Sequence, residues 1–143
     1  MASFFRHLSV CFAAGAFGGL VNALFVWGAG QFGLTELIGV AMAPAWSPPW
    51  LYQRMVWGGF WGLLFLAPLL SQSVWVRGAL FGLFPSAVML MLIFPKVLGK
   101  GMFGLELGQW TPLFVLAANA AWGVAAAWWM VLCREKSRAR GLM

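Results

Sequence analysis

The sequence is poor in ionisable side chains and contains no aspartate. Three of its 143 residues are acidic, nine are lysine or arginine, and His7 is the only histidine. Catalytic triads of serine, histidine and aspartate therefore cannot form, and carboxylate-rich calcium or magnesium sites lack ligands. The single histidine leaves no material for a histidine-ligated zinc site or a bis-histidine haem within one chain. We expect no enzymatic activity, no cofactor and no bound metal.

Apolar and aromatic residues dominate the composition instead. The chain is 63% hydrophobic and 8% charged, whereas soluble domains are roughly half apolar and a quarter charged. It also holds 10 tryptophans, 13 phenylalanines and 18 glycines. Membrane proteins use aromatic residues at the bilayer interfaces and glycine within their spans. The composition excludes a soluble fold and predicts an integral membrane protein.

Charged residues divide the chain into apolar runs. Four of these runs reach the roughly 18 uncharged residues needed to cross a hydrocarbon core about 30 Å thick. The first run continues past the length of a signal peptide, so we expect it to remain as a span. The sequence predicts an all-α, compact four-transmembrane-helix bundle forming a single domain over residues 1–143, with spans at Leu8–Gly30, Leu51–Leu70, Val74–Phe94 and Pro112–Leu132.

A fifth apolar run, Leu37–Gln53, differs from the others because it contains Pro44, Pro48 and Pro49. Proline breaks helices, and backbone groups without hydrogen-bond partners cannot face lipid. We therefore expect this run to form an interfacial or re-entrant loop on the outer side of the membrane.

The basic residues lie at the ends of the apolar runs, not in an exposed stripe. This placement argues against nucleic-acid binding despite the net charge of +6. With four spans both termini share one side, and the excess of basic residues on that side predicts cytoplasmic termini in a bacterial inner membrane. That side holds Arg6, Arg77, Arg134, Lys136, Arg138 and Arg140, whereas Arg54, Lys96 and Lys100 fall on the other side.

The basic tail at residues 133–143 has two interpretations. The simpler one is a topology anchor that holds the last span in place. The alternative is electrostatic binding of anionic lipid headgroups by the four basic residues of the tail. These are Arg134, Lys136, Arg138 and Arg140.

Two asparagines are the strongest polar candidates inside the spans. Counted from the outer ends of the first and last spans, Asn22 and Asn119 lie at a common depth of about 10 to 12 Å. Asparagine in lipid seeks a partner, so a pair within the chain or between two copies would hold helices together. The alternative is that both side chains bind a solute. The surrounding residues are also alike, which reflects either an internal two-fold relation or coincidence.

The two acidic residues outside the tail lie in glycine-rich apolar loops at the outer face. Glu36 and Glu106 would form a proton or cation site at the mouth of a pathway, with Arg54 and Lys100 beside them. The alternative is that each carboxylate pairs with a nearby base and fastens its loop to the bundle. Neither residue is placed in the middle of the membrane, where ionisable groups are functional by default.

Small residues four positions apart occur in every predicted span. Such spacing places them on one helical face, where two backbones can approach closely. We expect some of these faces to pack within the bundle and the remainder to contact copies of the chain or other subunits. The residues are Gly15, Gly19, Gly58, Gly62, Gly78, Gly82 and Gly123.

Two functions follow from these patterns. The first is a non-catalytic structural or accessory subunit that packs into a larger membrane complex or a homo-oligomer. The second is an oligomeric transporter or channel for a small solute or ion, with Glu36, Glu106 and the two asparagines lining a polar route. Four helices are few for a pathway in one protomer, so transport would require an oligomer.

Overall fold

The structure is a computed structural model that describes residues 1–70 and 72–141, with side chains described to Arg134. The described residues form helices and contain no strand. Three helical segments are long and apolar enough to cross a membrane: Ala2–Gln31, Val74–Val97 and Thr111–Arg134. The predicted all-helical membrane class is confirmed at this level. The side chains of Lys136, Arg138 and Arg140, predicted to contact lipid, lie outside the described residues.

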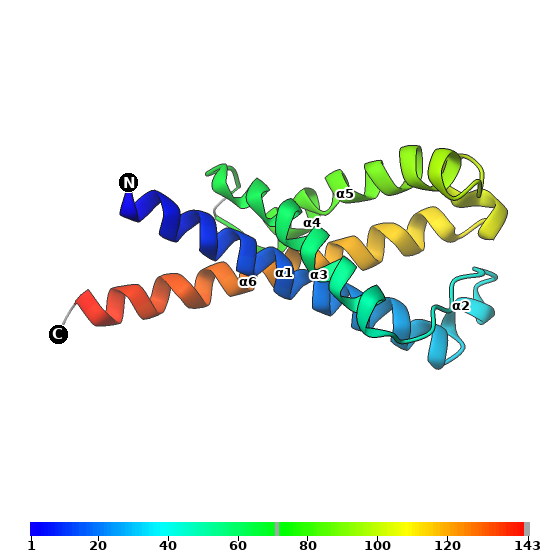
Figure 1. The fold of residues 1–143 in the computed structure, drawn as a ribbon, viewed down its shortest axis with the longest axis horizontal. Helices are drawn as coiled ribbons and strands as arrows, with labels where there is room; N and C mark the ends of the chain where they lie inside the picture. The colour runs from blue at the N-terminus through cyan, green and yellow to red at the C-terminus, as the bar shows by residue number, and fades with distance from the viewer. Residues whose placement is uncertain (71, 142–143) are drawn as a thin grey trace.

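Two long helices form the centre of the fold. Helices α1 (Ala2–Gln31) and α6 (Thr111–Gly141) cross near their middles. The start of α1 and the end of α6 lie at the same end of the elongated molecule (Figure 1). Helix α3 (Pro48–Gly62) lies along α1, and helix α4 (Val74–Phe81) packs against α6. Each central helix therefore carries one flanking helix.

The helix of the second predicted span begins before Leu51, and its α-helical part is shorter than the predicted span Leu51–Leu70. Helix α3 is 15 residues long and continues as the 3-10 helix η1 (Leu63–Leu66). The oxygen of Ser47 accepts a hydrogen bond from the Trp50 amide at 3.4 Å, and prolines occupy the first two helical positions. Proline is favoured there because its missing N–H would have no partner within the helix. Pro48 and Pro49 thus start a helix inside the segment predicted to be a loop.

The third predicted span is helical but irregular. Helix α4 is followed by α5 (Leu83–Val88) and by η2 (Met89–Val97), a wider π-helical segment. Pro85 and Pro95 lie inside this stretch, and each removes one backbone donor from the helix. The amide of Leu98 then donates to the carbonyl of Ile93 at 2.8 Å, five residues back. The prolines therefore explain why the 24-residue segment is not one regular α-helix.

The connection after α1 and the connection before α6 meet through their backbones. A short helix, α2 (Leu34–Leu37), follows α1, and the 3-10 helix η3 (Met102–Leu107) precedes α6. The Ala41 amide donates to the Leu107 carbonyl at 2.7 Å. This contact joins the connection after the first span to the connection before the last one.

The predicted small-residue faces are used inside the chain. A Cβ added at Gly15 would lie against the Gly58 carbonyl and 2.5 Å from the Gly62 Cα, so α1 and α3 touch backbone to backbone. Gly78 meets Gly123 and Val124 in the same way, and this contact joins α4 to α6. Gly19 packs against the backbone at Arg54 and Met55, and Gly82 packs against Asn119. These seven glycines are therefore not left over for a partner.

Candidate functional site

A chain of hydrogen-bonded side chains crosses the centre of the bundle. The Asn22 amide nitrogen donates to Asn119 Oδ1 at 3.2 Å, and Asn119 Nδ2 donates to the hydroxyl of Ser86 at 3.0 Å. At the other end, the Arg54 guanidinium donates to Asn22 Oδ1. The four side chains come from α3, α1, α6 and α5. We call this set, Arg54, Asn22, Asn119 and Ser86, the polar chain.

Close helix contacts position the polar chain. Gly19 lies one turn before Asn22 and allows the backbone of α3 to approach α1 at Arg54. Gly82 allows α6 to approach at Asn119, and the Ser86 hydroxyl donates to the Gly82 carbonyl at 2.8 Å. The glycine contacts and the polar contacts are therefore parts of the same helix crossings.

Within the polar chain, Asn22 and Ser86 have used most of their hydrogen-bonding capacity. Asn22 Nδ2 makes a second donation, to the Ala118 carbonyl at 2.9 Å, and its Oδ1 accepts from Arg54. Asn22 and Ser86 are 7% and 1% exposed, so these groups have exchanged water for protein partners. The geometry satisfies buried polar groups and ties four helices together.

The observed position of Arg54 differs from the position predicted from the sequence. The sequence predicts Arg54 at the outer end of the second span, beside Glu36 and Glu106, whereas the structure places it on α3, partly buried, with its guanidinium carbon 4.6 Å from the Trp50 ring centroid. Its hydrogen-bond acceptor is the neutral amide of Asn22. The amide and the aromatic ring that contact this guanidinium carry no compensating negative charge.

The predicted carboxylates lie away from the polar chain. Glu36 on α2 and Glu106 on η3 are both exposed, and so is Lys100. The Glu106 side chain lies beside Gly101, and the backbone amide of Glu106 donates to the Lys100 carbonyl at 3.2 Å. Within residues 1–70 and 72–134, no hydrogen bond connects either carboxylate to the asparagines. The structure thus brings together the asparagines and Arg54, and separates them from the two glutamates.

Sequence reasoning missed two ties that the structure contains. Ser86 is one; it is the only hydroxyl between Val74 and Phe94, which is the signal that could have found it. The other is Trp122, a buried residue whose indole nitrogen donates to the Gly15 carbonyl at 3.0 Å. Interfacial use is the default for tryptophan, so composition alone did not place Trp122 in the core.

Arg77 was also missed as a structural residue, because sequence assigned it only a topology role. It is 6% exposed, and its Nη2 donates to the carbonyls of Phe65 and Ala67, each at 2.9 Å. Its guanidinium also lies over the rings of Phe65 and Phe81, at 5.0 and 5.5 Å. Arg77 therefore closes the end of η1 onto α4.

The fold and the site together define an all-helical protein with three membrane-length helices and the polar chain through its centre. Among the described residues, no three His, Cys, Asp or Glu side chains lie close enough to hold a metal ion. Neither described hollow in the surface is lined by the polar chain. No protein-family model, no curated protein and no solved structure matches this chain.

Proposed function

We propose that this protein is a non-catalytic structural or accessory subunit of a larger membrane complex or a homo-oligomer in the bacterial inner membrane. The observation that carries the proposal is the polar chain. Its side chains Asn22, Asn119 and Ser86 form hydrogen bonds with one another and with backbone carbonyls. A conducting route needs polar groups that are free to exchange partners with a solute. Here those groups support helix packing.

The proposal includes four membrane crossings with both termini cytoplasmic. Helix α3 and η1 are continuous over residues 48–66, and at 1.5 Å per α-helical and 2.0 Å per 3-10 residue they extend about 30 Å. That length matches the hydrocarbon core. The start of α1 and the last described turn of α6 lie at one end of the molecule, as an even number of crossings requires (Figure 1).

The packing also indicates which surface would meet a partner. Because the glycine faces are occupied within the chain, a partner would contact the large apolar side chains on the outside of the bundle. Phe60 and Trp57 on α3 are examples, being 55% and 59% exposed with ring centroids 6.0 Å apart. The seven glycines themselves pack within the chain, as expected for part of the small-residue faces.

Affinity purification from native membranes in a mild detergent tests the proposal. We expect a second chain, or further copies of this one, at a fixed ratio that survives washing. Phe60→Ala should reduce the ratio without lowering the yield of folded protein, because it shortens an exposed side chain. Gly28→Ala, which adds a methyl group 4.0 Å from the Phe32 ring, is the matched control and should leave the ratio unchanged.

A second candidate function is transport of a small ion, and Arg54 is the observation that favours it. Ionisable residues within a membrane often mark an ion pathway, and Arg54 pairs with an amide instead of a carboxylate. The transporter reading predicts proton or chloride flux in proteoliposomes that falls at least tenfold in Arg54→Gln, Glu36→Gln or Glu106→Gln. The subunit proposal predicts no flux above that of empty liposomes for the parent protein.

A further inference from the structure

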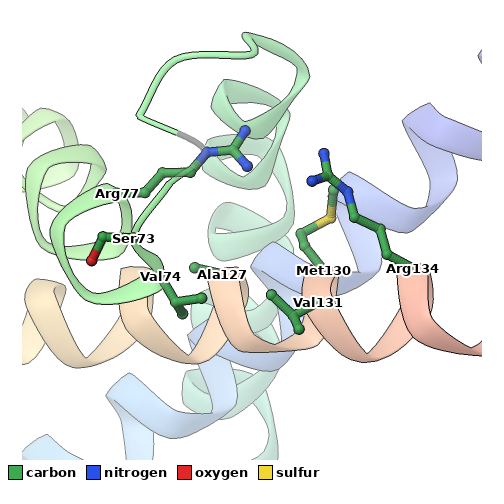
Figure 2. A pocket seen from close by; sticks show the side chains of 7 residues that line it. All are labelled: Ser73, Val74, Arg77, Ala127, Met130, Val131 and Arg134. Atoms are coloured by element: carbon green, nitrogen blue, oxygen red, sulfur yellow. The ribbon is translucent and has the colours of Figure 1, made fainter.

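A small cavity lies at the cytoplasmic end proposed above, away from the polar chain. It is lined by Ser73, Val74 and Arg77 from the start of α4, and by Ala127, Met130, Val131 and Arg134 from α6. Figure 2 shows the guanidinium groups of Arg77 and Arg134 on the same side of α6, pointing toward one another. Two like charges are thus held around one hollow, and none of the described side chains that line it is acidic.

One polar atom of a residue that lines this cavity has no partner. The Nε of Arg77 is buried and makes no hydrogen bond in the described structure, although Nη2 of the same group makes two. An unpaired buried donor on a charged group is costly because its desolvation is not compensated, so such donors are normally satisfied. The Arg77 side chain is 6% exposed and forms part of the cavity wall.

The start of α4 adds to the positive character of the hollow. The Ser73 oxygen accepts from the Val76 amide at 3.3 Å, which accounts for one of the amides in the first turn. The remaining first-turn amides of a helix lack partners within it and attract anions. Two arginines, one unpaired donor and a helix start therefore converge from two helices.

We propose that this cavity binds the phosphate group of an anionic phospholipid headgroup. The cavity volume of about 20 Å³ holds one water-sized atom, so one phosphate oxygen enters beside Arg77 and the rest of the group stays at the mouth. Arg134 is exposed and completes the site from α6. Arginine suits this role because its planar donors match two phosphate oxygens at once.

The position of the cavity favours a lipid over a dissolved anion. It lies where the η1–α4 connection meets the last turns of α6 before the basic tail, at the level expected for headgroups of the cytoplasmic leaflet. That leaflet carries the anionic lipids. Inorganic phosphate shares the same chemistry, so the experiment compares the two sources.

The test measures binding to purified, delipidated protein in a neutral detergent. Phosphatidylglycerol, phosphatidylcholine and inorganic phosphate are titrated separately, and the thermal unfolding midpoint and the lipids retained in native mass spectrometry are recorded. We expect phosphatidylglycerol to raise the midpoint and to be retained at one site, and phosphatidylcholine to do neither. Arg134→Gln should weaken phosphatidylglycerol binding about tenfold, the loss of one charge-assisted hydrogen bond.

Arg6→Gln is the matched control, because Arg6 is exposed on α1 and loses the same charge. It should weaken binding by less than twofold. Equal weakening by the two substitutions would show diffuse electrostatic attraction and overturn the site, as would equal binding of the two lipids with no effect of phosphate. A shift produced fully by inorganic phosphate, and lost in Arg134→Gln, would uphold the site and assign it to the free anion.

Discussion

Gly15→Ala is expected to lower the thermal unfolding midpoint in detergent by about 10 °C, corresponding to a loss of about 3 kcal/mol. The added methyl group would meet the Gly58 carbonyl and lie 2.5 Å from the Gly62 Cα, and neither backbone atom can rotate away. The helices α1 and α3 must separate, which disturbs the Gly19 contact at Arg54 one turn further along. The free energy of unfolding should therefore fall by the upper range of overpacking effects.

The control is another glycine of the same helix. A Cβ at Gly28 has open space apart from the Phe32 ring at 4.0 Å, so Gly28→Ala should be neutral or slightly stabilising through its higher helix propensity. Gly123→Ala, which places a methyl group against the Gly78 backbone, should behave like Gly15→Ala. Equal midpoints for Gly15→Ala and Gly28→Ala would disprove the backbone contact between α1 and α3.

Asn22→Ala is expected to cost about 3 kcal/mol of stability. The substitution removes the acceptor for the Arg54 guanidinium and two donations, to Asn119 and to the Ala118 carbonyl. Hydrogen bonds to charged groups contribute about 1.5 to 3 kcal/mol, and losing one partner leaves the other desolvated. Reversible unfolding in mixed micelles, followed by circular dichroism, measures the loss.

A double-mutant cycle separates this tie from simple loss of volume. If Arg54 depends on Asn22, Arg54→Met should cost less in the Asn22→Ala background than in the parent, by at least about 1 kcal/mol. Asn22→Asp keeps the acceptor for Arg54 but cannot donate to Asn119 Oδ1 or to the Ala118 carbonyl, so it should recover only the part of the stability that comes from the Arg54 contact. Additive effects of Asn22→Ala and Arg54→Met would contradict a hydrogen-bonded chain through the bundle centre.

The sequence predicted the membrane class and the long helices because charged residues are excluded from spans. Spacing of small residues also marked the close contacts, since glycines four apart share a helical face whichever helix they meet. Which faces meet depends on tertiary packing, so the internal pairing of Gly15 with Gly58 and Gly62 could not be read beforehand.

The errors of interpretation concern residues whose role depends on their neighbours. Pro48 and Pro49 break a helix from inside but begin one when a capping serine precedes them, and the apolar run around them hid Ser47. Arg54 was expected in the first turn of a span beginning at Leu51, at the outer end of that helix. Helix α3 begins at Pro48 instead, which puts Arg54 further along the helix, where it contacts Asn22 and brings a cation to the central site.

The mass of the protein released from native membranes tests the central claim most directly. Native mass spectrometry in a mild detergent should show an assembly heavier than the 15.6 kDa of one chain, at one defined stoichiometry. The assembly should also form with Arg54→Gln if folding is retained, because the polar chain serves packing within the protomer. A lone 15.6 kDa chain in every mild detergent, with ion flux in proteoliposomes, would contradict the account.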